Sequence, residues 1–200
     1  AAFVSAMGSA GTIAGGDRLK QAHPETRIVG LEPVQCPTLF ENGYGGHDIQ
    51  GIGDKHIPLI HNVMNTDFAV AVSDRSTDAL HVLFNSDVGR EYLGSRRGVP
   101  DDAIAQLSSL GLSSIANMLA AVKMARYLDL GPDDVVLTVA TDGAAMYGSE
   151  LAKIEARQFA AGFNESSADE VFGEHVLGAN TDLLLELGQR QRTRIFNLGY

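Results

Sequence analysis

A strand-like run that stops at a glycine-containing loop opens the chain, where residues 1–16 read AAFVSAMGSAGTIAGG. The pattern predicts a buried strand over residues 1–7, a loop over 8–12 and a helix over Thr12–His23. Backbone N–H groups at a helix N-terminus lack intrahelical partners and carry partial positive charge, so this loop suits a phosphate group. Its spacing matches neither the dinucleotide-binding G-x-G-x-x-G pattern nor the P-loop. The residues alone therefore favour phosphate binding and a plain strand-to-helix turn equally.

Short β-branched runs alternate with helical periods along the rest of the chain, which is typical of an α/β layered fold. Further strands are expected at 27–33, 67–74 and 133–143. Further helices are expected at 77–93, with Ser76 as its N-cap, and at 114–128, 149–161, 168–177 and 181–188. The stretch 34–65 has no clear period, and a loop of that length inside a compact domain is usually functional.

Composition excludes several classes of protein. The formal charge is −10, from 25 acidic and 15 basic residues, and this disfavours a nucleic-acid surface. The sequence holds no apolar run of membrane-spanning length, so no membrane contact is expected. Cys36 is the only cysteine, which excludes an intrachain disulfide and fits a reducing, cytoplasmic compartment. Because the chain opens directly on strand-like residues without a start Met, we expect residues upstream of Ala1.

Five segments follow the order and approximate spacing of one enzyme family's motifs. They read GSAGTIAGG (8–16), RIVGLEP (27–33), IQGIGDKHIP (49–58), GLSSIANMLAAVKMA (111–125) and VVLTVATDGAAMY (135–147). Together they resemble the cysteine synthase family, which are pyridoxal-phosphate (PLP) enzymes of the tryptophan synthase β fold type, or fold type II. The phrases QCPTL, GIGDKHIP, HNVMNTD and FGEHVLGA more closely resemble a subgroup described as PLP-dependent protein subunit beta. The resemblance implies a three-layer α/β/α fold with a helical C-terminal tail.

The same resemblance assigns the contacts to the cofactor. It places the cofactor phosphate on Gly8, Ser9, Ala10, Gly11 and Thr12. Gly51, Ile52 and Gly53 match the loop that lines the cofactor beside its reactive face. The next three residues depart from the usual cysteine synthase residues, and we expect them to face the substrate entrance and alter specificity: Asp54, Lys55 and His56.

Ser113 matches the family serine that hydrogen-bonds the pyridine nitrogen of the cofactor. A hydroxyl, unlike a carboxylate, does not hold that nitrogen protonated, so the ring is a weaker electron sink and suits β-elimination and β-replacement. By its position alone Ser113 also suits the N-cap of a helix beginning at Ser114. Asp142 either orders the pyridine-side hydrogen bonds or caps its turn. Residues 143–146 (GAAM) replace the serine and the Gly-Glu-Arg of the family's turn.

No catalytic residue is assigned in this chain, because none of its four lysines matches the family's Schiff-base lysine. They are Lys20, Lys55, Lys123 and Lys153. In the family that lysine and the loop that binds the substrate carboxylate lie upstream of the position of Ala1. We therefore expect a missing N-terminal portion, or a companion chain, to complete the enzyme, and a homodimer as its assembly. Residues 1–148 would form a partial cofactor-binding domain and 149–200 a helical extension.

A metal site is not expected. His47, His56 and His61 lie near Asp48 and Asp54 in the sequence, but their spacing matches no standard zinc arrangement. Loop histidines are more often hydrogen-bonded or exposed than bound to metal. Cys36 is better explained as a small buried hydrophobic residue than as a reactive thiol.

Three functions stay open at the level of sequence. The first is PLP-dependent β-elimination or β-replacement on a small amino-acid substrate. The second is a PLP-dependent dehydratase or ammonia-lyase on the same fold. The third is a degenerate, non-catalytic cofactor-fold subunit, which the altered GAAM turn favours and the retained Ser113 and phosphate loop oppose.

Overall fold

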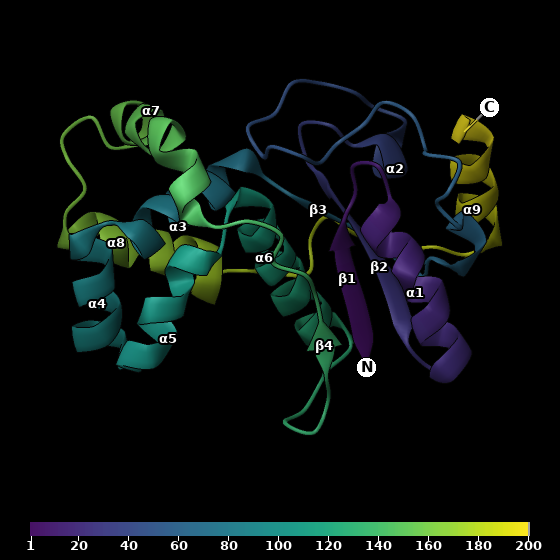
Figure 1. Ribbon diagram of the computed structural model, residues 1–200, viewed down its shortest axis with the longest axis horizontal. Coiled ribbons are helices and arrows are strands. Elements are labelled where there is room, and N and C mark those ends of the chain that lie inside the picture. Colours follow the sequence, from purple (N-terminus) through teal and green to yellow (C-terminus); the bar gives the residue numbers. More distant parts are fainter. Residues whose placement is uncertain (200) are drawn as a thin grey trace. The chain divides into compact units, whose positions relative to one another are not determined.

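The computed structural model describes residues 1–199, and the chain divides into two compact units. We call residues 1–74, 116–139 and 180–200 the sheet unit, and residues 75–115 and 140–179 the helical unit. Each unit is therefore assembled from segments that are far apart in the sequence (Figure 1). The expected division at residue 148 stays a prediction.

The sheet unit is built, within residues 1–199, on a five-stranded sheet in the order β4-β1-β2-β3-β5. Parallel to one another run β1 (Ala2–Ala6), β2 (Arg27–Pro33), β3 (Phe68–Val72) and β4 (Val136–Leu137). The fifth strand, β5 (Leu184–Glu186), pairs antiparallel with β3. The strands β1 to β3 are almost wholly buried, as expected of parallel strands that are covered on both faces.

Several helices belong to the sheet unit. They are α1 (Gly11–Ala22), α2 (Thr38–Glu41), α9 (Gln189–Phe196) and most of α6 (Leu112–Tyr127), with 3-10 turns at Val63–Asn65 and Asn197–Gly199. The long loop over 34–65 therefore contains only two short helical turns.

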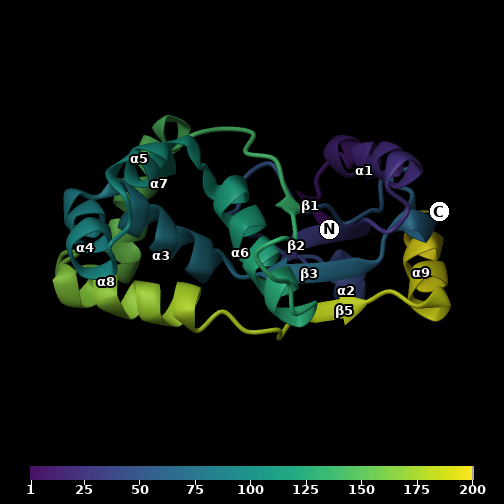
Figure 2. The ribbon, with the colours of Figure 1, turned by 90° about the horizontal axis from the view of Figure 1, so that it is seen from below.

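Helices cover both faces of the sheet, which confirms the predicted three layers. Helix α1 packs on β1 and β2, and its Ile13 shares a buried cluster with Ala69 of β3. Successive side chains of a strand point to opposite faces, so Phe68 lies on the other side from Ala69. There its ring meets Tyr127 of α6 edge-on, with 5.6 Å between centroids. Figures 1 and 2 accordingly place the strands between α1 and α6.

The helical unit contains most of α3 together with several further helices. They are α3 (Asp74–Asn85), α4 (Asp87–Arg97), α5 (Asp101–Gln106), α7 (Gly148–Gln158) and α8 (Glu165–Phe172), with 3-10 turns at Leu107–Ser109 and Ala144–Tyr147 and a π-helical turn at Gly173–Leu177. Arg97 joins α4 to α8, because its guanidinium lies over the Phe172 ring and pairs with Asp169 at 2.8 Å. Arg157 of α7 reaches the fully buried Asp78 of α3 at 2.5 Å.

No helix within residues 1–199 is both long and apolar enough to cross a membrane.

The expected helix over 181–188 is wrong, because its centre forms strand β5. The leucine-rich run reads locally as helical, but it pairs with the otherwise open edge of β3, with Val70 opposite Leu184. Leu187, just after the strand, then reaches the buried cluster of the sheet unit. Tertiary pairing has overridden local propensity here.

The buried strand expected over 133–143 is also reduced, to the two residues of β4. It pairs only with β1, at the edge of the sheet, through Ala2 opposite Val136 and Phe3 opposite Leu137. An edge strand is covered less completely than a central one, so Leu137 remains 48% exposed.

The single helix expected over 77–93 is two helices, α3 and α4. Ser86 separates them, since its hydroxyl accepts a hydrogen bond from the Gly89 N–H at 3.1 Å and caps α4. Ser76 lies inside α3, so its predicted role as an N-cap is wrong.

Asn117 of α6 links the helix to two strand ends, and its removal tests that link. Its buried side chain accepts from the Ala6 N–H at 2.8 Å and donates to the Val139 carbonyl at 3.1 Å. Asn117→Ala leaves both backbone groups without this partner, so we expect the free energy of unfolding to fall by about 2–4 kcal/mol in a urea titration. Asn180→Ala, which removes an exposed amide bonded to Asp182, is the control and should change it by less than about 0.5 kcal/mol. Equal effects of the two variants would contradict this role.

Candidate functional site

The loop between β1 and α1 has a conformation suited to an anion. Ala10 stands at the N-cap position of α1 with φ 64° and ψ 10°, in the left-handed region, and no side chain caps the helix. A residue with a Cβ costs about 1 kcal/mol in that region, and such strain is typical of binding sites. The exposed Ser9 and Thr12 flank this turn. The first N–H groups of α1 are therefore available to an external acceptor.

A second glycine segment lies directly against this loop. The Gly53 N–H donates to the Met7 carbonyl at 2.7 Å. A Cβ added at Gly8 would lie 2.6 Å from the Gly51 carbonyl oxygen, closer than real Cβ atoms approach. Gly51 and Gly53 themselves have positive φ values, 78° and 77°, and a Cβ on Gly53 would collide with the His47 ring. Only glycine allows these two backbones to come so close.

These features fit the phosphate group of a bound cofactor. An anion site of this type needs converging backbone N–H groups and a surface without side chains. The uncapped N-terminus of α1 and the Gly8–Gly51 approach supply both within the sheet unit. The structure thus brings together residues 8–12 and 51–53, which the sequence analysis selected separately. We define these two segments as the glycine cradle.

Glu32, at the end of β2, anchors the loop that carries the second half of the cradle. It is buried, and its two carboxylate oxygens accept from the Leu39 N–H at 2.8 Å and the Phe40 N–H at 3.0 Å. Thr38, in the same helix α2, donates to the Asp54 carbonyl at 2.5 Å. A cavity of about 10 Å³, room for one water molecule, is lined by Glu32 and the cradle residues Gly8 and Gly53.

Burial raises the pKa of Glu32 to about 7, while the N–H groups of Leu39 and Phe40 and the charge of Arg194 oppose that shift. Burial dominates because a charged carboxylate loses its hydration in the protein interior. The side chain therefore titrates close to neutral pH.

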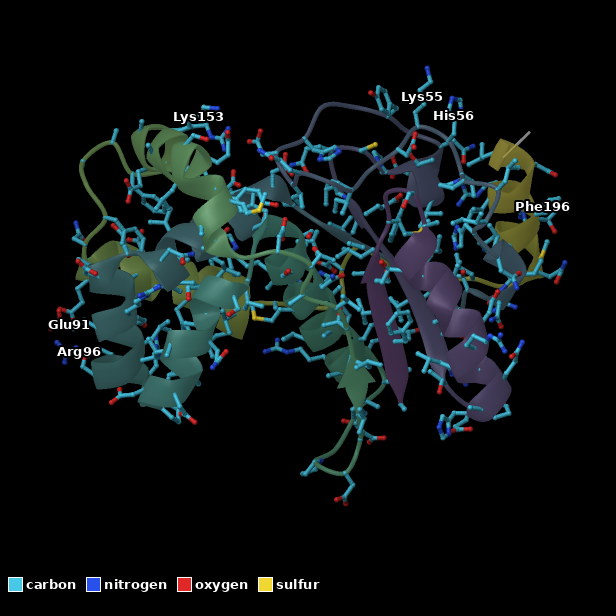
Figure 3. All side chains as sticks on the ribbon, in the orientation of Figure 1. Lys55, His56, Glu91, Arg96, Lys153 and Phe196 are labelled. Atoms are coloured by element: carbon cyan, nitrogen blue, oxygen red, sulfur yellow. The ribbon has the colours of Figure 1, made fainter. Side chains whose placement is uncertain are left out.

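The three residues predicted at the substrate entrance follow the cradle directly. Asp54, Lys55 and His56 are all exposed, and Figure 3 shows Lys55 and His56 pointing outward from the long loop. The Asp54 side chain accepts from the His56 N–H at 3.2 Å, and the Lys55 ammonium lies 6.0 Å from the Tyr44 ring centroid. All three residues are exposed to solvent, and their role in specificity stays a prediction.

Ser113 and Asp142, both in the helical unit, are joined through Thr141. The Ser113 and Thr141 hydroxyl oxygens are 3.3 Å apart, and the Thr141 hydroxyl lies 3.5 Å from one Asp142 carboxylate oxygen. The buried Tyr147 donates to the other Asp142 oxygen. Burial, followed by the hydrogen bond to Asp142 and its charge, raises the pKa of Tyr147.

Ser113 is the second residue of α6 and not its N-cap, so the alternative role as a cap is wrong. The residue is 7% exposed, and its hydroxyl oxygen lies 3.3 Å from that of Thr141. The neighbouring Ser114 is more deeply buried, and among residues 1–199 its hydroxyl has no hydrogen-bond partner. Ser113 and Ser114 thus place two hydroxyl groups in the buried first turn of α6.

The histidines do not form a cluster. His61 is buried with its Nε2 2.8 Å from the Thr66 hydroxyl, and burial lowers its pKa to about 4. His47 packs against Gly53, and His56 is exposed. Across residues 1–199 no three His, Cys, Asp or Glu side chains are grouped to hold a metal ion.

Cys36 is fully buried, which confirms its interpretation as a core residue.

Sequence reasoning missed Glu32 and Thr141. A signal existed for Glu32, because a charged residue at the end of an otherwise apolar strand is expected to need buried partners. Thr141 gave no local signal, since its contact with Ser113 spans 28 positions in the chain.

Replacement of Glu32 by Gln tests its titration. Folding raises the pKa of Glu32 from 4.5 to about 7, so the stability from its proton uptake is fully present below pH 4.5 and is lost as pH rises through 7. The difference is on the order of 3 kcal/mol. We expect urea titrations from pH 4.5 to 8 to show this loss in the unmodified protein and not in Glu32→Gln. The same change at the exposed Glu41 controls for the loss of one charge, and an unchanged slope in Glu32→Gln would contradict the assignment.

Comparison with known proteins identifies relatives of one kind. Cysteine synthase B of Campylobacter jejuni is 34% identical over 146 residues, which are 72% of this chain and 42% of that protein. The crystal structure of an O-acetylserine dependent cystathionine beta-synthase from Helicobacter pylori matches with 31% identity and a TM-score of 0.55, over 74% of this chain and 42% of that one. A hydrogen sulfide-producing enzyme from Fusobacterium nucleatum matches with 26% identity and a TM-score of 0.57, over 85% and 44%. No protein-family model matches the chain.

The sequence matches and the structural matches point to the same group of enzymes, and both kinds of match extend over most of this chain. The chain spans less than half the length of these relatives, 42% in the case of cysteine synthase B. The chain is thus a relative of the cysteine synthases within the fold type II superfamily of PLP-dependent enzymes.

Proposed function

We propose that this chain is the cofactor-holding part of a PLP-dependent enzyme that performs β-elimination and β-replacement on a small amino acid. The observation that supports it best is the glycine cradle, where Gly8 meets Gly51 beside the uncapped start of α1. A phosphate ester binds where backbone N–H donors are unpaired and no side chain blocks its approach to them. Bound PLP supplies the electron sink for chemistry at the α-carbon of an amino acid.

The residues of the chain then have distinct tasks. Backbone N–H groups of residues 8–12 bind the phosphate, with the Ser9 and Thr12 hydroxyls as further donors. The segment 51–53 forms a wall that keeps side chains away from the cofactor. Ser113 contacts the ring nitrogen and Asp142 orders the hydrogen bonds around it. Asp54, Lys55 and His56, exposed beside the cradle, contribute to the choice of substrate.

The Schiff-base lysine belongs to the rest of the enzyme. Lys20 is paired with Asp67 at 2.7 Å and Lys153 with Glu150 at 2.8 Å, and both lie on helices. Lys55 points outward from its loop (Figure 3). We propose that an N-terminal portion or a companion chain supplies this lysine, which moves the α-proton. A homodimer in the cytoplasm is the assembly we propose.

A second candidate is a dehydratase or ammonia-lyase on the same scaffold, favoured by the departure of residues 54–56 from the cysteine synthase pattern. The two reactions differ in product. An added thiol incorporated into the amino acid supports β-replacement, whereas steady release of keto acid and ammonia supports the alternative. The altered turn at 143–146 favours a non-catalytic subunit, which would form neither product.

The first experiment is reduction of the purified, complete protein with borohydride, followed by peptide mapping of the pyridoxyl-lysine. We expect the label outside residues 1–200, in the remaining portion or a companion chain. A label on Lys55 would overturn the site assignment. Absence of colour and label in the complete protein would leave the non-catalytic subunit as the better explanation.

A glycine replacement tests the cradle directly. Gly8→Ala places a Cβ 2.6 Å from the Gly51 carbonyl oxygen, so the two backbones must separate and misalign the donors of α1. Loss of one such charge-assisted hydrogen bond costs about 1.5–3 kcal/mol, so we expect PLP to bind about 10- to 100-fold more weakly in a fluorescence titration.

The matched control is Gly15→Ala, in the same helix α1. A Cβ there meets nothing within 4 Å, and alanine favours the helix, so stability should rise slightly and PLP affinity should stay unchanged. If Gly8→Ala binds PLP as tightly as Gly15→Ala does, the cradle is not the phosphate site.

A further inference from the structure

Arg194, on the C-terminal helix α9 (yellow in Figure 1), reaches the long loop that carries half of the glycine cradle. Its guanidinium donates to the Leu39 carbonyl of α2 and to the side-chain oxygen of Asn42, the C-cap residue of α2. A guanidinium carries several donors in one rigid plane, so a single arginine can hold two acceptors in a fixed geometry. Arg194 therefore fixes the C-terminal end of α2 within the sheet unit.

Leu39 is held through both of its backbone polar groups. Its N–H donates to the Glu32 carboxylate at 2.8 Å, and its carbonyl accepts from Arg194. Burial raises the pKa of Glu32, and the charge of Arg194 acts against that shift, so the two side chains attract each other when the carboxyl is ionised. The end of β2 and a helix about 150 positions away thus restrain the same residue.

From α2 the contacts continue to the cradle. The Thr38 hydroxyl donates to the Asp54 carbonyl at 2.5 Å. The preceding residue, Gly53, donates its N–H to the Met7 carbonyl at 2.7 Å, directly before Gly8. A displacement of α2 is therefore transmitted to the position of Gly53 relative to Gly8.

The apolar side of α9 packs beneath the same segments. Ile195, next to Arg194, is fully buried and fixes the position from which the guanidinium reaches α2. It belongs to a buried cluster that also includes residues from both halves of the candidate site and from α2, namely Met7, Ala10, Leu39 and Ile57.

We propose that Arg194 is a positioning residue of the cofactor site: by fixing α2 it holds the segment 51–53 against Gly8, so that the affinity for the phosphate group of PLP depends on the C-terminal helix. The inference rests on the proposed function, in which the glycine cradle binds that phosphate. A long irregular loop has many conformations, so each contact that restricts it beforehand reduces the entropy lost when a ligand binds.

Arg192 offers a matched control on the same helix. It donates to the Thr66 carbonyl at 2.9 Å and to the Asp67 carboxylate at 3.1 Å, both directly before β3. Replacement of either arginine by Gln removes one charge and two contacts from α9. The contacts of Arg194 are to α2, whereas those of Arg192 are to the start of β3.

The first measurement is amide hydrogen exchange of Gly53 in the complete protein freed of PLP, located by mass spectrometry. We expect exchange about 10-fold faster in Arg194→Gln than in Arg192→Gln, because a charge-assisted hydrogen bond that opposes local opening is lost. In a fluorescence titration PLP should bind about 5- to 10-fold more weakly to Arg194→Gln, and to Arg192→Gln as tightly as to the unmodified protein.

A second variant leaves α9 intact. Asn42→Gly removes one of the two acceptors of Arg194, and glycine suits the positive φ of 57° at that position. We expect faster Gly53 exchange and weaker PLP binding, each by a smaller factor than in Arg194→Gln. Should Arg194→Gln fail to fold, Asn42→Gly makes the same comparison with Arg192→Gln.

Two results would overturn the role of Arg194. One is equal Gly53 exchange in the Arg194 and Arg192 variants, and the other is faster exchange with unchanged PLP affinity. Failure of the unmodified protein to bind PLP would instead refute the proposed function. The exchange rates, measured without PLP, would still decide whether Arg194 holds the segment 51–53 in place.

Discussion

The hydrogen bond from the Gly53 N–H to the Met7 carbonyl, 2.7 Å long, joins the end of β1 to a loop that has no regular structure of its own. It brings Gly51 so close to Gly8 that a Cβ on Gly8 would lie 2.6 Å from the Gly51 carbonyl oxygen. The long loop after β2 is then tethered at its other side by Glu32 and Thr38. The geometry of the candidate site depends on this tethering, because an irregular loop keeps its shape through contacts such as these and not through a helix or strand of its own.

Much of the fold was accessible from local patterns, and the two errors that concern the sheet have a common cause. The strand predicted over 27–33 matches β2 residue for residue. Its apolar residues favour an extended strand, and Pro33 marks the end of that strand. The errors at 133–143 and 181–188 concern the strands at the two edges of the sheet, β4 and β5. Edge strands are short and partly exposed, so pairing partners that are distant in sequence decide them and local composition does not.

The site shows the same division between local and long-range information. The glycines at 8, 51 and 53 carry their own signal, because close backbone approach excludes every other residue. The roles of Glu32 and Thr141 arise only when segments far apart in sequence meet. Ala10 combines both situations. Its loop was selected from the sequence, but an alanine gives no hint of the left-handed backbone conformation that it adopts in the structure.

The altered turn at 143–146 acquires a physical interpretation from these contacts. The resemblance leads one to expect a serine where Gly143 stands, directly after Asp142. In this chain the hydroxyl next to Asp142 is on its other side, at Thr141, and it faces Ser113. Gly143 meanwhile allows close packing, since a Cβ there would lie 3.0 Å from the Ser108 carbonyl. Although the usual turn residues are replaced, Ser113 therefore keeps a hydroxyl partner in this turn, the side chain of Thr141 at 3.3 Å.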